Sequence, residues 1–306
     1  MVNSRRSPSR WALGALAIAV VGASSTVAQE PSPPPAPSAE KQKMIDLGVE
    51  HKTSRGLYDY LKQQANGGKP LTWSTVPDWS GLWTREASPF FFDPDQTSMT
   101  QLPTAKMTPA YKKMLLEKLD RVSKGLEFDA LSNCEPAGMP RWLVEPFLRE
   151  NVVTPNETWL ITEQQNEIRR VYTDGRDHPN PDDAYPLWEG DSIGFWDGDK
   201  LVIHTNQMHA GQYQRIQPFY SDKVETVEIW HLQDPDTMTV DVWAYDPPAL
   251  AEPWYTKQVY KRLSNEDKSL RIRYWDCQEN QNNTVTETKE GSSTYKDFTF
   301  TKQDDK

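Results

Sequence analysis

The sequence has few of the residues on which many enzyme sites depend. Its 306 residues include only five histidines and two cysteines. Glycine-rich loops that bind phosphates or dinucleotides are absent, and so are zinc-type histidine spacings such as H-x-x-x-H. Aspartate pairs occur at turns, but none continues into a twelve-residue calcium loop. We therefore expect no cofactor and no metal.

Positive charge is also scarce. The chain has 34 lysines and arginines against 44 acidic residues, which gives a net charge of -10. Removal of the arginine-containing leader described below would take this charge to about -13. Nucleic acids and anionic membrane surfaces need cationic patches, so the sequence disfavours both as partners.

Residues 1–28 have the pattern of a signal peptide. Three arginines precede the apolar stretch Trp11–Ala23, and Thr26-Val27-Ala28 forms a small-residue cleavage site. The apolar stretch is too short to span a bilayer, and no later stretch is longer. Pro8 disfavours the twin-arginine route. We expect a soluble periplasmic or secreted protein without an integral membrane segment.

Export to an oxidising compartment predicts a disulfide between Cys134 and Cys277, which would close a loop of about 140 residues. Two free buried thiols are the alternative.

The chain divides by composition into four segments. The signal peptide is followed by a proline-rich linker at 29–39 and a helical extension at 40–75. In this extension we expect two short helices between Glu40 and Gln64, interrupted at Gly48 and Gly56. Residues 76–306 form the predicted β-barrel domain. Within it, Thr108 as N-cap, Pro109 and Gly125 predict one flanking helix.

The remaining pattern is that of short strands joined by turns. Asp197-Gly198 gives the clearest hairpin signal. The expected extended segments are 142–146, 150–154, 158–162, 167–172, 193–196, 200–205, 224–232, 237–245, 254–263, 270–277 and 294–301. Sequential hairpins favour an all-β fold, an antiparallel meander that closes into a lipocalin-like barrel, with a sandwich as the alternative.

Two motifs carry a family resemblance. RRVYTDGRDHP (169–179) and WEGDSIGFWDGDKLVIHT (188–205) resemble motifs of a large group of uncharacterised exported bacterial proteins. PDWSGLW, CEPAGMPR and DCQEN elsewhere in the chain are similar too. The resemblance implies a secreted β-rich protein and no particular activity. The chain departs from the pattern at His204 and in its extension before Val76.

The turn after residue 171 collects polar groups. Tyr172, Asp174, Arg176 and His178 would bring donors, acceptors and an imidazole to one rim of the barrel. The plainer interpretation is turn chemistry, with Arg176 paired to Asp174.

Alternation on the strand around His204 puts Leu201 and Ile203 on one face and His204 and Asn206 on the other. His204 is therefore either a core histidine or a general base facing a cavity. A third alternative is metal binding by His178, His204, His209 and His231, which the missing zinc spacing disfavours.

Glu228 shares a mostly apolar strand face with Trp230. A buried carboxyl there could act as an acid or base with a raised pKa. An ion pair with Arg169, Arg170 or Arg271 is the alternative.

These observations predict a cavity lined by aromatic rings that binds an apolar or aromatic small molecule. A cofactor-independent acid–base enzyme (lyase, isomerase or hydrolase) is the alternative, with His204, Glu228, Tyr172, Asp174 and His178 as catalytic residues. The predicted ligand-binding residues are Arg176, Trp196, Asn206, His209, Trp230 and Trp243.

Overall fold

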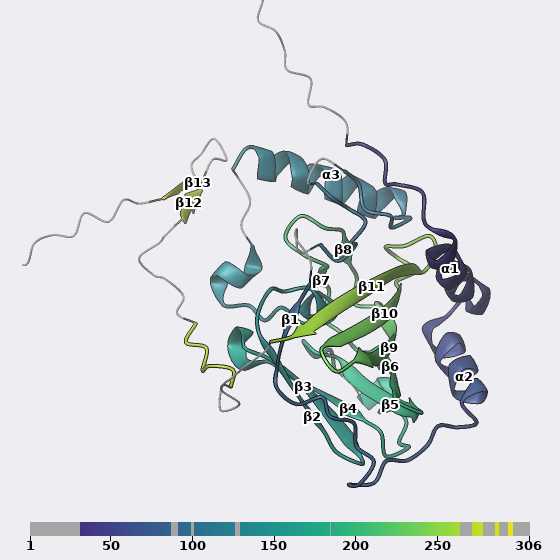
Figure 1. The fold of residues 1–306 in the computed structure, drawn as a ribbon. Helices are drawn as coiled ribbons and strands as arrows, with labels where there is room; N and C mark the ends of the chain where they lie inside the picture. Colours follow the sequence, from purple (N-terminus) through teal and green to yellow (C-terminus); the bar gives the residue numbers. More distant parts are fainter. Residues whose placement is uncertain are drawn as a thin grey trace, which may run out of the picture. The chain divides into compact units, whose positions relative to one another are not determined.

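Nine strands close a β-barrel in the computed structural model of the protein (Figure 1). The structure describes residues 31–86, 91–98, 101–125, 129–183, 185–263, 271–277, 285–287 and 293–295. The expected signal peptide lies outside these residues. Around the barrel the strand order is β1-β11-β10-β9-β6-β5-β4-β3-β2. Their bounds are β1 Leu82–Arg85, β2 Arg149–Val153, β3 Glu157–Thr162, β4 Ile168–Tyr172, β5 Asp191–Asp197, β6 Lys200–Asn206, β9 Glu225–Asp234, β10 Thr237–Tyr245 and β11 Trp254–Arg262.

The predicted all-β barrel with a few helices is confirmed, and its hairpins lie where turn residues predicted them. β3 pairs with β4, β5 with β6, and β9 with β10, all antiparallel. Gly198 in the β5–β6 turn has a φ of 64°, a conformation that glycine adopts without strain. β1 closes the barrel because it pairs with β11 on one side and β2 on the other.

The barrel is not a pure meander. β4 and β5 pair in parallel, Val171 with Ser192 and Tyr172 with Ile193. A parallel neighbour cannot be reached by a tight turn, so β4 and β5 are joined by a long crossover connection, whose described residues are 173–183 and 185–190. The turn at Asp174-Gly175 therefore does not form a hairpin.

Two expected strands are wrong in the described residues. Arg141–Leu143 forms a buried 3₁₀ helix where residues 142–146 were expected to extend. Residues 271–277 belong to no strand, and Leu270 lies outside the described residues. At the end of the chain, β12 (Val285–Glu287) pairs with β13 (Ser293–Tyr295); residues 296–301 of the expected last strand also lie outside them. The two-residue strands β7 (Gly211–Gln212) and β8 (Phe219–Tyr220) pair with each other.

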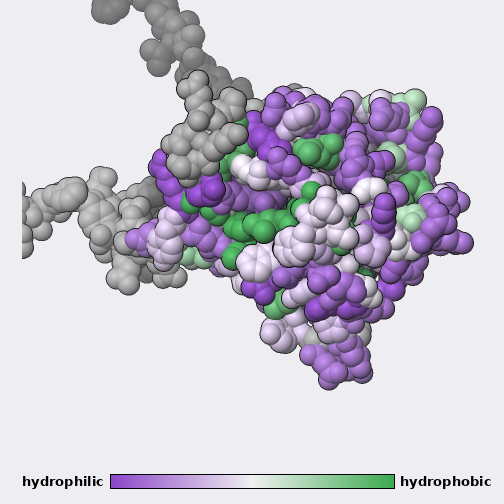
Figure 2. All heavy atoms as spheres, turned by 60° about the horizontal axis from the view of Figure 1, so that its bottom comes forward, coloured by the Kyte–Doolittle hydropathy of each residue, from purple (hydrophilic) through white to green (hydrophobic). Residues whose placement is uncertain are grey.

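Tryptophan rings fill much of the barrel interior. Trp79, Trp83, Trp142, Trp196 and Trp230 are at most 2% exposed and belong to one apolar cluster. Large rings in contact bury extensive apolar area, which is the main stabilising contribution to such a core. Figure 2 shows a face on which hydrophilic residues surround a narrower band of hydrophobic ones. These five tryptophan rings are buried inside.

A helical hairpin covers part of the barrel's outer face (Figure 1). α1 (Ala39–His51) contacts β11, and α2 (Ser54–Gln64) contacts β6, β9 and β10. Leu57 and Tyr58 of α2 pack against outward-facing Phe195 and Val202 in a second apolar cluster. The predicted 40–75 extension is therefore packed on the barrel.

The two helices separate at Lys52 rather than at the glycines. Thr53 begins α2 as its N-cap, accepting a hydrogen bond from Gly56 N. Gly48 lies inside α1, where a Cβ would lie 2.6 Å from Trp243 Cδ1, so the helix packs closely on Trp243 at this glycine. α3 (Pro109–Ser123) has Thr108 as its N-cap, as expected.

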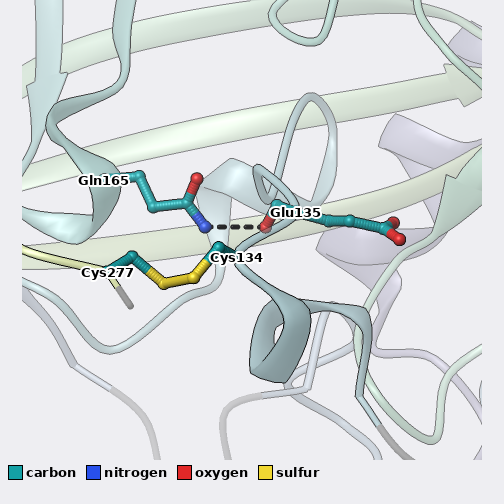
Figure 3. Close-up of a disulfide and its surroundings, with 4 residues drawn as sticks. All are labelled: Cys134, Glu135, Gln165 and Cys277. Atoms are coloured by element: carbon teal, nitrogen blue, oxygen red, sulfur yellow. Dashed lines mark hydrogen bonds between the residues drawn. A yellow bond between two sulfur atoms is a disulfide. The ribbon is translucent and has the colours of Figure 1, made fainter. Parts of the chain in front are cut away.

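The predicted disulfide is present. Cys134 and Cys277 are joined, with their Cα atoms 5.8 Å apart (Figure 3). Beside the bond, Gln165 Nε2 donates to the Glu135 carbonyl at 2.8 Å. Asn166 bonds the backbone of Arg273 and Trp275 at 2.8 and 2.7 Å. Residues 271–277 are thus fastened to the β3–β4 turn. In the described residues, no helix is long and apolar enough to cross a bilayer.

We predict that Cys134→Ser lowers the free energy of unfolding by about 5 kcal/mol, because the bond restricts a long loop in the unfolded chain. Urea denaturation would measure this change. Cys277→Ser should match it, and adding a reductant should affect only the wild type. Equal denaturation midpoints for oxidised and reduced wild type would contradict the prediction.

Candidate functional site

Five polar side chains form a continuous row at one end of the barrel. Asp191 contacts His178 Nδ1, and His178 Nε2 lies 2.7 Å from His204 Nδ1. His204 Nε2 in turn lies 3.1 Å from Ser54 Oγ and 3.5 Å from Glu225 Oε2. Ser54 Oγ donates to the same Glu225 oxygen. We call these five residues the polar row.

The row is assembled from four strands and loops of the barrel and from one helix outside it. His204 near the end of β6, Asp191 at the start of β5 and Glu225 at the start of β9 lie at the same end of the sheet. His178 comes from the crossover loop between β4 and β5. Ser54 is the first residue of α2. The helix hairpin thus completes the row.

Further contacts hold the row in place. Arg55 on α2 bonds Asp177 at 2.6 Å, next to His178 in sequence. The ring of Tyr58, one turn along α2, lies 5.6 Å from that of His204. Side-chain exposure is 7% for His178 and 3% for His204. Both imidazoles are therefore shielded from water.

The shielding affects ionisation at the pocket end of the row. Burial lowers the pKa of the His204 imidazole below its ordinary value, and Glu225 offsets this only in part. Burial raises the pKa of the Glu225 carboxyl, but hydrogen bonds with His204 and Ser54 outweigh that effect and leave the pKa below its usual value. A neutral His204 beside an ionised Glu225 is therefore the favoured pairing.

Because His204 is neutral, the row has two alternative arrangements that differ in which end carries an extra proton. With the proton on His178, beside Asp191, His204 accepts at Nδ1 and donates from Nε2 to Ser54, which donates to Glu225. With the proton on Glu225, the carboxyl donates to Ser54, Ser54 donates to His204 Nε2, and His204 Nδ1 donates to His178. The total number of protons is the same in both arrangements. The row can therefore move a proton between the shielded imidazole and the Glu225 carboxylate.

The exposed end of the row opens into a pocket of about 870 Å³. Ser54 and Glu225 form part of its wall, and Asn206 and Tyr245 lie at the ends of the adjacent strands. Prolines from the loop after β10 form much of the rest. The pocket thus lies at the barrel end rather than in the ring-filled interior where we expected a cavity.

Glu228 belongs to a different polar group, inside the barrel. In the β6–β9 pairing Ile203 lies opposite Glu228, whereas His204 lies opposite Val227. Glu228 and His204 therefore lie on opposite faces of the sheet and do not share a cavity. Glu228 is fully buried and receives two hydrogen bonds of 2.8 Å from Arg169. This is the ion pair named as the alternative for Glu228.

The other predicted catalytic residues remain at the rim. Arg176 bonds Asp174 at 2.6 Å and lies over the Tyr172 ring, 3.9 Å from its centroid. All three are at least partly exposed, and none has a described bond to the polar row. His178 is the one member of that turn which joins His204.

The predicted ligand-binding residues are dispersed. Trp196 and Trp230 are in the interior, where Trp230 stacks on Tyr260 and donates to Glu228. Trp243 lies under α1 and donates to the Met44 carbonyl. The His209 ring lies 4.8 Å from that of Trp188. Of this set, only Asn206 lines the pocket.

Sequence reasoning missed Ser54, Asp191 and Glu225. Glu225 had a signal, because strand alternation placed it on the face shared by Val227 and Ile229. Ser54 had none, since it lies 150 residues from His204 in sequence and meets it only through helix packing.

A metal cluster is not found at the row. Within the described parts of the chain, no group of three or more His, Cys, Asp or Glu side chains is placed to hold a metal ion.

The chain matches no known protein-family model, and a search of curated proteins found no similar sequence.

We predict that Glu228→Ala destabilises the protein by about 3–5 kcal/mol, because Arg169 would keep a buried charge without its counter-ion. Thermal or urea denaturation measures the change. Replacing both residues with methionine should restore most of the loss. The control Glu86→Ala removes an exposed partner of Lys261 and should have little effect. An equal loss of unfolding free energy in Glu228→Ala and Glu86→Ala would contradict the prediction that the buried pair matters more than the exposed one.

A second prediction concerns pH. Because the folded pKa of His204 is lowered, the unfolded chain takes up a proton at higher pH than the folded chain does. The stability from this group is complete above the unfolded pKa of about 6.5 and is lost as pH falls toward the folded value. His204→Gln should therefore reduce the fall in unfolding free energy between about pH 8 and about pH 5.

The matched control is His231→Gln, since the His231 side chain is 30% exposed and lies on the same strand as Glu225. It shows how far the removal of an imidazole other than that of His204 changes the pH dependence. An unchanged slope in His204→Gln would be inconsistent with a neutral His204.

Proposed function

We propose that the protein is an exported barrel protein that binds a small organic molecule in the pocket at the barrel end and transfers a proton to or from it. The observation that carries the proposal is the unbroken polar row, which leads from shielded His178 to Glu225 in the pocket wall. A pocket of about 870 Å³ falls within the range of small-molecule sites.

In this proposal Glu225 is the catalytic acid–base residue that meets the ligand. As a carboxylate it accepts a proton from the bound molecule. Ser54 and His204 then relay a proton inward, and His178 holds it with Asp191 as counter-ion. The reverse sequence returns a proton to the ligand. Such a cycle suits a lyase or isomerase that needs no cofactor.

The apolar part of the pocket wall supports an organic ligand. Tyr185, Tyr245, Leu250 and several prolines contribute apolar surface, with Glu225 as a polar group among them. Binding without proton transfer is the simpler form of the proposal.

Export is proposed on separate grounds. The signal-peptide pattern favours periplasmic location or secretion, and the Cys134–Cys277 disulfide is typical of an oxidising compartment. We also propose kinship with the exported β-rich proteins whose motifs the chain resembles.

The test is a proton-exchange screen in D₂O. Mixtures of small organic molecules with acidic C–H bonds would be incubated with the protein, and loss of each C–H signal followed by ¹H NMR. We expect exchange of some members, slowed by roughly 10²–10⁴-fold in Glu225→Gln and also slowed in His204→Gln. Glu117→Gln on the exposed side of α3 should behave as wild type.

Two outcomes would overturn catalysis. One is the absence of protein-dependent exchange across the screen; the other is exchange that persists at the wild-type rate in Glu225→Gln. If ligand signals broaden on binding without any exchange, the protein is a binding protein only.

A further inference from the structure

We propose that the pocket selects an organic cation, a molecule with an apolar body and an ammonium group that binds Glu225 Oε1. The inference rests on the proposed function, since it concerns the ligand of the same pocket. It commits to one chemical class among the small molecules that the pocket volume admits.

One oxygen of Glu225 is available for a ligand. Both described contacts of the carboxylate, with Ser54 Oγ and His204 Nε2, involve Oε2. The side chain is 39% exposed and belongs to the pocket wall. A ligand in the pocket can therefore donate a hydrogen bond to Oε1 without displacing a member of the polar row.

The polar row does not supply Glu225 with a fixed positive charge. Its neighbours there are a hydroxyl and an imidazole whose pKa burial lowers. Hydrogen bonds from these two groups keep the Glu225 pKa low despite burial, so the carboxylate remains ionised at neutral pH. An ammonium group would supply the missing charge, and charge-assisted hydrogen bonds are stronger than neutral ones.

The pocket wall as a whole has more acidic than basic residues. Its basic residues are Lys52 and Lys223, whereas its acidic residues are Asp222, Glu225, Asp246 and Glu252. Lys223 lies 3.4 Å from Asp222, and Glu252 is paired with Lys106 at 2.7 Å. When these paired groups are set aside, one base, Lys52, and two acids, Glu225 and Asp246, are left, so the wall is negative overall. Together with the net charge of -10, this field attracts cations and repels anions.

The apolar part of the wall accounts for the ligand's body. The lining includes Leu250, Tyr245 and three prolines, Pro247, Pro248 and Pro253. The Tyr245 hydroxyl donates to the Gly48 carbonyl at 3.0 Å. An aliphatic or aromatic group would be buried against these residues, and aromatic faces also attract cations.

The experiment compares three probes with one ring: cyclohexylmethylamine, cyclohexylmethanol and cyclohexanecarboxylic acid. Calorimetry at neutral pH on the full chain should show the amine binding at least about tenfold more tightly than the alcohol. The acid should bind most weakly. Glu225→Gln should remove the preference for the amine, and Glu225→Asp should retain part of it. Added salt should weaken binding of the amine more than of the alcohol.

His231→Gln serves as the control, and circular dichroism checks that each variant is folded. Should Glu225→Gln fail to fold, Ser54→Ala keeps the carboxylate and should keep the preference for the amine. Equal or tighter binding of the alcohol or acid, or an amine preference that persists in Glu225→Gln, overturns the inference. Failure of all three probes to bind overturns it as well.

The two proposals can fail separately. Amine binding that depends on Glu225, without proton exchange in the D₂O screen, contradicts catalysis and leaves the cation site standing. Glu225-dependent exchange confined to neutral or anionic molecules supports catalysis and contradicts the cation site.

Discussion

The apolar outer face of strands β5, β6, β9 and β10 is the constraint on which the site depends. Phe195, Val202, Val227 and Trp243 point outward from these strands and are at most 5% exposed. Left in water, this surface would forfeit the stabilisation that its burial gives. The helix hairpin α1–α2 covers it, and the covering brings the first residue of α2 to His204.

That packing gives the molecule two polar groups with different surroundings. Inside the barrel, Arg169 donates to Glu228 and to Thr205, and Glu228 accepts further hydrogen bonds from Thr226 and Trp230. Nothing in this group opens to the pocket. Outside, under α2, the imidazoles of the polar row are shielded, and the row reaches the pocket at Ser54 and Glu225. A shielded row with one open end is suited to proton transfer, whereas a closed ion pair is suited to holding strands together.

The crossover between β4 and β5 supplies His178, which lies between Asp191 and His204 in the polar row. A parallel pair requires a long connection, and this connection carries His178 back across the barrel end to Asp191 and His204. Arg55 fixes the same loop to α2 through Asp177. The departure from a simple meander is therefore also what allows a residue of the crossover loop to reach a strand residue.

The sequence by itself determined most of the barrel strands and the faces of their residues. Alternation correctly separated Ile203 from His204, Asp197-Gly198 marked its hairpin, and two cysteines in a chain with a signal-peptide pattern predicted the disulfide. The first two features depend on local backbone geometry. The disulfide could be predicted because two cysteines allow one pairing. Only the tertiary structure decided that β4 and β5 are parallel, that Glu228 faces Arg169, and that Ser54 completes the row. Such contacts join residues as far as 171 positions apart in the chain, as in Ser54 and Glu225, and neither periodicity nor turn chemistry extends over that separation.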